Sequence, residues 1–183
     1  MSPKLLLGGS LLLLLLLAGC APSARGVRAQ HDIGSALRPL VLEGPELHAS
    51  LVTRKLEDAA VLALAPVLRD NPQLSTDSVS VDVIAQIASQ SRLGGGEGVR
   101  AALYALYLGE TQVGLYGLEA ASPADADRIE GVLRAIWSHN ERLGRTRVYR
   151  EGQVLVVAWH DGVSPSCWEA VNARVVERMT ARR

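Results

Sequence analysis

The alternation of apolar and polar residues is clearest in the second half of the chain, from residue 101 to residue 182. Residues 101–108 and 112–119 are rich in Leu, Tyr and Val and flank Gly109-Glu110, a pattern that predicts a β-hairpin. Residues 147–150 and 153–160 flank Glu151-Gly152 in the same way and predict a second hairpin.

Each predicted hairpin is followed by a Ser-Pro pair and then by apolar residues at helical spacing. Ser122-Pro123 and Ser164-Pro165 are typical of helix starts, because serine caps the first turn and proline suits the first helical position. The two apolar stripes are Ala126, Ile129, Leu133, Ile136 and Trp137 in the first helix, and Trp168, Val171, Val175 and Met179 in the second.

The order strand, strand, helix therefore occurs twice, over residues 101–143 and 145–182, and suggests a repeat of two ββα units. One such unit cannot bury both faces of its apolar parts. Two units together predict an α+β fold, with a four-stranded antiparallel sheet and both helices packed on one face.

The first half of the chain predicts one or two helices and a tether. Residues 50–69 carry a helical stripe that begins at the potential cap Ser50. Residues 77–91 carry an apolar helical face, although 79–83 also alternates as a strand would; its members are Val79, Val83, Ile84, Ile87 and Ala88. Residues 21–36 have no apolar period and are interpreted as a flexible tether, which leaves a single domain over 37–183.

The amino terminus has the features of a secretory signal. Lys4 precedes an apolar stretch of about 15 residues, which is shorter than the roughly 20 residues that a membrane-spanning helix needs. A short transmembrane anchor remains the alternative. The stretch ends in Leu-Ala-Gly-Cys at residues 17–20, which resembles the bacterial lipobox.

This resemblance to bacterial lipoproteins implies that residues 1–19 are a signal peptide removed on export. It also implies that Cys20 receives a diacylglycerol and that its new amino terminus is acylated, with a fatty acid such as palmitate. Two or three chains give stable membrane anchoring. Because Ala21 and not aspartate follows the cysteine, the expected location is the outer membrane, facing the periplasm, if the cell has two membranes.

Composition excludes some functions. The chain has 19 basic and 19 acidic residues, and loss of Lys4 with the signal leaves 18 against 19, a formal charge of −1. There is no basic excess, so we expect no nucleic-acid partner. With Cys20 lipidated, Cys167 has no cysteine to pair with. No Gly-x-Ser-x-Gly or His-Glu-x-x-His motif is present, and no cofactor is predicted.

One group of residues has chemical character. His160 and Asp161 end the last predicted strand, and Cys167 lies in the first turn of the next helix. A helix amino end favours a thiolate, and a nearby imidazole could act as its base. The same three groups could hold a soft metal such as zinc. The alternative, which we favour, is that Cys167 is packed as a small apolar group.

A local basic run consists of Arg142, Arg145, Arg147 and Arg150, and on a strand Arg145 and Arg147 would share a face. They could bind a carboxylate, a phosphate or an acidic partner, or they could guard a solvated sheet edge. Tyr104, Tyr107 and Tyr116 on the first hairpin could form a stacking platform, although packing in the core is the favoured interpretation.

These patterns predict a membrane-anchored envelope lipoprotein with a non-enzymatic binding or structural domain. Its partner is expected to be an envelope protein or a cell-wall component, bound through an exposed sheet face or the arginine edge. The alternative hypothesis is a small enzyme or metal-binding module centred on His160, Asp161 and Cys167.

Overall fold

In the computed structural model, residues 33–55 and 67–181 are described, and they all belong to one structural unit. The predicted lipobox and the tether up to residue 32 lie outside the described residues. In chain order, the elements are η1 (Arg38–Leu40, a 3-10 helix), α2 (Gly44–Leu47), β1 (Val52–Thr53), β2 (Gln73–Ser75), α4 (Ser78–Ala88), β3 (Val99–Leu108), β4 (Gln112–Ala120), α5 (Pro123–Arg142), β5 (Thr146–Glu151), β6 (Val154–His160) and α6 (Pro165–Thr180).

Both predicted hairpins are confirmed. In the first, β3 and β4 are antiparallel and Leu108 lies opposite Gln112. In the second, β5 and β6 are antiparallel and Glu151 lies opposite Val154. The hairpins join through β4 and β6, which are also antiparallel, so the predicted α+β class and antiparallel sheet are correct.

The sheet nevertheless has six strands among the described residues, not four. The sheet order is β1-β3-β4-β6-β5. β1 and β2 both pair with the outer edge of β3, each along a different stretch of that strand. The helix predicted over 50–69 is wrong where it can be seen, because Val52 and Thr53 pair with Leu108 and Tyr107. The unpaired backbone groups along β3 need partners, and this pairing overrides the helical stripe. Residues 56–66 lie outside the described ranges.

The Asn71 side chain bridges the gap between β1 and β2 on the edge of β3. Its Oδ1 accepts a hydrogen bond from the Leu106 N–H at 2.9 Å, and its Nδ2 donates to the Leu106 carbonyl at 2.6 Å. The amide thus replaces one residue of a strand and keeps the β3 edge satisfied where the backbone of its neighbours turns away.

The predicted helix starts are confirmed at both Ser-Pro pairs. The Ser122 Oγ accepts the Asp125 N–H and the Ser164 Oγ accepts the Cys167 N–H, with proline in the first turn of each helix. The helix predicted within 77–91 is confirmed as α4, and Ile84 and Ala88 of the predicted face are buried, whereas Val79 is 60% exposed and lies outside the buried face. Among residues 33–55 and 67–181, no helix is both long and apolar enough to cross a membrane.

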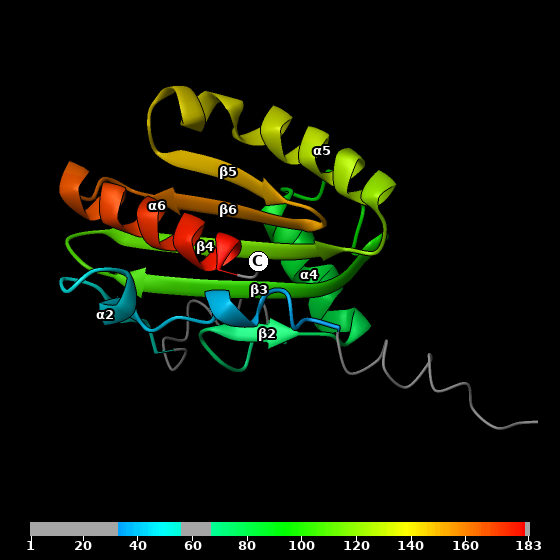
Figure 1. Cartoon of the computed structure of the whole chain (residues 1–183), viewed down its shortest axis with the longest axis horizontal. Coiled ribbons are helices and arrows are strands. Elements are labelled where there is room, and N and C mark those ends of the chain that lie inside the picture. The colour runs from blue at the N-terminus through cyan, green and yellow to red at the C-terminus, as the bar shows by residue number, and fades with distance from the viewer. Residues whose placement is uncertain (1–32, 56–66, 182–183) are drawn as a thin grey trace, which may run out of the picture. The chain divides into compact units, whose positions relative to one another are not determined.

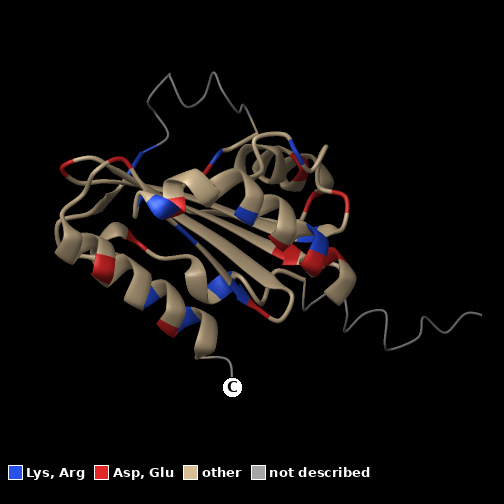
Figure 2. Ribbon diagram, turned by 90° about the horizontal axis from the view of Figure 1, so that it is seen from above, with Lys and Arg blue, Asp and Glu red and all other residues tan. Residues whose placement is uncertain are grey.

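The two long helices lie on opposite faces of the sheet, so the prediction of helices on one face is wrong. Along β6, Val156 and Ala158 belong to the core beneath α6, whereas Leu155 and Val157 belong to the core shared with α4 and α5. Figure 1 shows α6 in front of the strands and α4 behind them. Figure 2 shows the charged residues chiefly on helices and loops, with the central strands largely free of them.

The reason lies in the composition of the central strands. Residues 154–159 are all apolar, which is typical of a strand buried on both faces and not of one with a solvated side. Covering both faces takes one long helix on each side. The expected exposed sheet face is therefore absent at β4 and β6, and it cannot be a recognition surface there.

The two ββα units have opposite hands. β4 and β6 are antiparallel neighbours, so a twofold rotation that exchanges them would keep both helices on the same face. Since α5 and α6 pack on opposite faces, no rotation superposes β3-β4-α5 on β5-β6-α6. The shared order of elements is thus not a repeat of one three-dimensional unit.

The packed part of the chain begins before the expected limit at Leu37. Ile33 and Ala36 pack against the core beneath α6, and the Gly34 N–H donates to Glu119 Oε2 at 3.0 Å. Glu119 is 1% exposed and its other oxygen lies 2.5 Å from the Arg100 guanidinium. This buried carboxylate fixes the chain at the point where it leaves toward Cys20.

Candidate functional site

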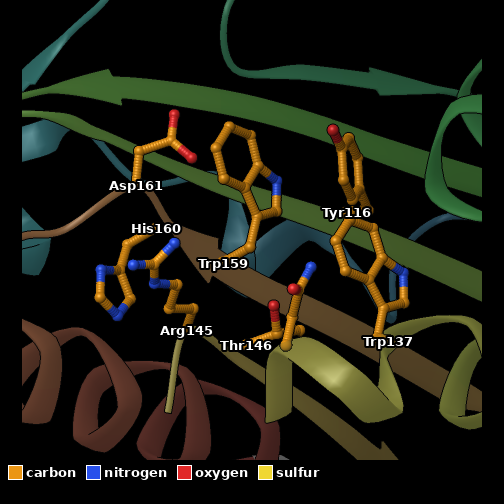
Figure 3. A pocket seen from close by; sticks show the side chains of 8 residues that line it. Tyr116, Trp137, Arg145, Thr146, Trp159, His160 and Asp161 are labelled. Carbon is orange, nitrogen blue, oxygen red and sulfur yellow. The ribbon is translucent and has the colours of Figure 1, made fainter. Parts of the chain in front are cut away.

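A cleft of about 360 Å³ opens at the end of the sheet where α5 and β6 finish and β5 begins. Four elements and the residues that adjoin them contribute to its walls, which places side chains distant in sequence around one space. The lining residues are Tyr116, Trp137, Asn140, Arg145, Thr146, Trp159, His160 and Asp161 (Figure 3).

A tight helix-to-strand connection builds one wall of the cleft. Gly144 has a φ of +72°, a conformation that favours glycine, and its N–H donates to the Glu141 carbonyl at 3.0 Å. The Arg145 N–H then donates to the Asn140 carbonyl at 2.9 Å, and the Arg145 carbonyl accepts the His160 N–H. This connection reverses the chain within three residues and holds Arg145 beside the end of β6.

Aromatic side chains form the floor. Trp159 lies opposite Gly114 on β4, where a Cβ would approach the indole to 2.3 Å, so only glycine leaves room for this ring. The Tyr116 ring stacks beside Trp159 with a centroid distance of 6.3 Å. The Trp137 indole is held by its N–H, which donates to the Ala88 carbonyl at 2.9 Å. Figure 3 shows the Trp159 and Tyr116 rings side by side, with the Trp137 indole on the Tyr116 side of the cleft.

Burial determines the protonation and the hydrogen bonding of the polar atoms in this floor. Burial raises the pKa of Tyr116, so its hydroxyl stays neutral and can donate or accept a hydrogen bond. The nearby Trp159 N–H lowers this pKa in part. This N–H is buried, and no described residue accepts a hydrogen bond from it with suitable geometry. A buried donor without an aligned partner is costly.

Arg145 and Asp161 bring opposite charges to one end of the cleft. Both residues are exposed, and neither forms an ion pair within residues 33–55 and 67–181. Asp161 is fixed through its backbone, because its N–H donates to the Gln112 carbonyl at 3.1 Å. These two side chains are therefore available to a ligand in the cleft.

His160 is part of the cleft wall, and both of its ring nitrogens are already in use. Its Nδ1 accepts the N–H groups of Gly162 and Val163 at 2.9 and 3.2 Å, while its Nε2 lies 3.2 Å from the Gly144 carbonyl. The neutral ring with its proton on Nε2 satisfies all three contacts. No lone pair is left for a general base or a metal ligand.

Cys167 lies in the core beneath α6 and is 2% exposed. Burial raises the pKa of its thiol, which disfavours the thiolate that a nucleophile or ligand requires. Within the described ranges, no three His, Cys, Asp or Glu side chains are grouped to hold a metal ion. Cys167 is therefore packed in the core, and the described side chains of His160, Asp161 and Cys167 are not grouped to hold a metal ion.

The three arginines of the predicted edge separate into two kinds. Arg150 lies on the α5 side of β5 and pairs with Asp127 and Glu130 at 2.6 and 2.8 Å. Its charge is therefore already paired within the chain. Arg145 and Arg147 are exposed and form no ion pair in the described part of the chain. Of these two, only Arg145 lines the cleft.

Sequence reasoning found Arg145, His160 and Asp161 but missed the aromatic floor. Trp137 carried a signal only for a helix stripe, and Trp159 looked like one apolar residue in a buried strand. Their convergence depends on the pairing of β4 with β6 and on where α5 crosses the sheet. The chain matches no protein-family model, no curated protein and no solved structure with which it was compared.

Proposed function

We propose that this protein is a lipid-anchored lipoprotein of the cell envelope whose folded domain binds an envelope component through the cleft beside Arg145. The lipobox at residues 17–20 supports the anchoring through Cys20. The absence of an aspartate after Cys20 supports the outer membrane, facing the periplasm, in a cell with two membranes.

The observation that carries this proposal is the position of the cleft relative to the chain's exit. Gly34 is held by Glu119 near the end of β4, whereas Val113 at the other end of β4 lies opposite His160 of the cleft. Val113 and Glu119 are six residue steps apart along the strand, a distance of about 20 Å. The cleft therefore lies at the end of the sheet opposite to the one that holds Gly34.

Binding fits the residues of the cleft better than catalysis. A site for recognition needs an apolar surface with a few fixed polar groups, and the rings of Trp159 and Tyr116 with the unpaired Arg145 supply these. A nucleophilic or metal-assisted reaction needs a free base or a ligand group. The His160 ring is committed to backbone groups, and the Cys167 thiol is buried.

The anchoring is tested by metabolic labelling with a palmitate analogue in a bacterium that processes lipoproteins. The wild-type protein should take up label and sediment with membranes, and Cys20→Ala should do neither. Cys167→Ala is the matched control, because it removes the other cysteine and should leave labelling unchanged. Label that persists in Cys20→Ala would contradict lipidation at this residue.

The role of the cleft is tested by placing a photocrosslinking amino acid at Asn140, which lines it, in living cells. The control position is Val176 on α6, which is 43% exposed on the opposite face. We expect a covalent adduct from position 140 only, weakened by Arg145→Gln and unaffected by Arg147→Gln. Equal adducts from both positions, or none from position 140, would refute recognition through this cleft.

A further inference from the structure

We infer that the ligand of this cleft is a sugar acid, with its pyranose ring stacked on the aromatic floor and its carboxylate bound by Arg145. The inference rests on the proposed binding function and names the class of ligand. The cell-wall component expected as a partner would then be recognised through a glycan unit that carries a carboxylate.

The lining of the cleft favours a sugar ring over an aromatic ring. A pyranose has an apolar face of C–H groups that can lie on the partly buried Trp159 and Trp137 rings, and hydroxyl groups around its edge; Tyr116, which is 8% exposed, supports Trp159 in the floor. Those hydroxyls can meet the Asn140 amide and the Asp161 carboxylate, which line the same space. An aromatic acid would desolvate these polar groups without giving them partners.

The size of the cleft is consistent with one such unit. At about 360 Å³ it lies at the lower end of the range for small-molecule sites. Its floor cannot easily widen, because Trp159 is seated on Gly114 and the Trp137 N–H is tied to Ala88. A rigid floor of this kind needs little reorganisation on binding.

The charges favour a single carboxylate over a phosphate. The Arg145 guanidinium presents a planar fork of N–H donors that matches a carboxylate with two parallel hydrogen bonds. Asp161 places a negative charge on the same wall, which opposes a doubly charged phosphate more strongly than a singly charged carboxylate. The same carboxylate can accept hydrogen bonds from sugar hydroxyls.

The experiment compares two probes that differ by one carboxylate. N-acetylmuramic acid and N-acetylglucosamine share the ring and the acetamido group, and only the first has a lactyl carboxylate. Mature lipidated protein in detergent is titrated with each probe while tryptophan fluorescence is followed. We expect N-acetylmuramic acid to bind about tenfold more tightly or better, the scale of a hydrogen-bonded charge pair. Equal affinity would overturn the inference.

Two matched variants assign the preference to one residue. Arg145→Gln should reduce the affinity for N-acetylmuramic acid to that for N-acetylglucosamine. Arg147→Gln removes the nearby exposed arginine on β5, which forms no ion pair among the described residues, and should change neither affinity. A preference that survives Arg145→Gln would overturn the assignment of the carboxylate to this guanidinium.

A third probe separates the class of ligand from the binding function. N-acetylphenylalanine carries a carboxylate on an aromatic ring compound, and tighter binding of this probe than of N-acetylmuramic acid would overturn the sugar ring. If neither sugar binds while the adduct from position 140 persists in cells, the inferred class is wrong and the cleft still recognises another partner. If the adduct is absent as well, the proposed function fails too.

Discussion

The two ends of the sheet use charge in opposite ways. At the tether end, defined by Gly34, Arg100 and Glu119, the carboxylate is buried; one oxygen accepts the Gly34 N–H and the other forms an ion pair with Arg100. At the cleft end, defined by Arg145, Trp159 and Asp161, the charged groups are exposed and unpaired within the described residues. The fold therefore uses charge to fix the chain at one end and leaves it available for recognition at the other.

The largest effect on stability is expected at the tether end. Glu119→Ala should lower the free energy of unfolding by about 2–3 kcal/mol, because it strands the Gly34 N–H and removes the partner of Arg100. The estimate lies below the range for fully buried pairs, since the Arg100 side chain is 41% exposed. Urea denaturation measures the loss.

The control for this variant is Glu110→Ala, which removes an exposed carboxylate from the β3–β4 turn and should cost less than about 0.5 kcal/mol. A similar loss in the two variants would mean that the buried carboxylate does not fix the chain at the tether end.

The next effect is expected at the floor of the cleft end. Gly114→Ala would place a Cβ 2.3 Å from the Trp159 indole, so the ring must move. Overpacking of this kind typically costs about 1–3 kcal/mol. The melting temperature should fall, and the tryptophan emission spectrum should shift as the ring leaves its seat.

Gly131→Ala supplies the comparison, because no neighbouring atom lies within 4 Å of its Cβ in α5. That variant should hold stability or raise it by about 0.5–1 kcal/mol, the advantage of alanine over glycine in a helix. An unchanged tryptophan emission spectrum in Gly114→Ala would show that the Trp159 ring keeps its position despite the added methyl group. The floor of the cleft would then be less tightly packed than described above.

A smaller effect is expected at Arg150, the arginine that is engaged inside the molecule. Its hydrogen bond holds the pKa of Glu130 below its ordinary value, so the pair contributes stability above the carboxyl's unfolded pKa of about 4.3. That contribution disappears as the pH falls through the lowered pKa of the folded state. Since both side chains are partly exposed, we expect only about 0.5–1 kcal/mol at neutral pH.

The stability difference between wild type and Arg150→Gln should accordingly shrink as the pH falls from about 5 to about 3. Guanidinium would screen the pair, so urea is the suitable denaturant. A difference that stays constant across this pH range would mean that Arg150 acts through packing and not through the Glu130 carboxylate.

The smallest effect on stability is expected at Arg145. Arg145→Gln should change the free energy of unfolding by less than about 0.5 kcal/mol, because the exposed side chain has no ion pair to lose in the described ranges. Thermal unfolding of the variant measures this. A loss as large as that of Glu119→Ala would make Arg145 a structural residue and would erase the contrast between the two ends.

The local parts of the fold could be predicted because short-range chemistry specifies them. Ser122 and Ser164 cap their helices through N–H groups three residues away, and each hairpin closes through a turn of a few residues. Such contacts depend on sequence neighbours alone.

Other parts depended on partners that the sequence pattern does not reveal. The strand at Val52–Thr53 exists because β3 offers an edge, and the helical stripe around it gave the wrong element. The face that each long helix covers is decided by how the chain crosses the sheet. An apolar run such as residues 154–159 signals burial on both faces but does not say which helix covers which face.

The candidate site shows the same division. Arg145 and Arg150 look equivalent along the sequence, and only the position of α5 gives Arg150 its two acidic partners. His160 and Cys167 look like a catalytic pair at a spacing of seven residues. The hydrogen bonds of the loop after β6 and the core beneath α6 give them separate structural roles.

The opposite hands of the two ββα units also bear on how this chain could have arisen. A duplicated gene segment encodes two copies that fold with the same hand, and gene fusion preserves that hand. The second unit could therefore have come from the first only if its helix later moved to the other face of the sheet, which would exchange the buried and exposed sides of every strand it covers. Independent origin of the two halves requires no such change.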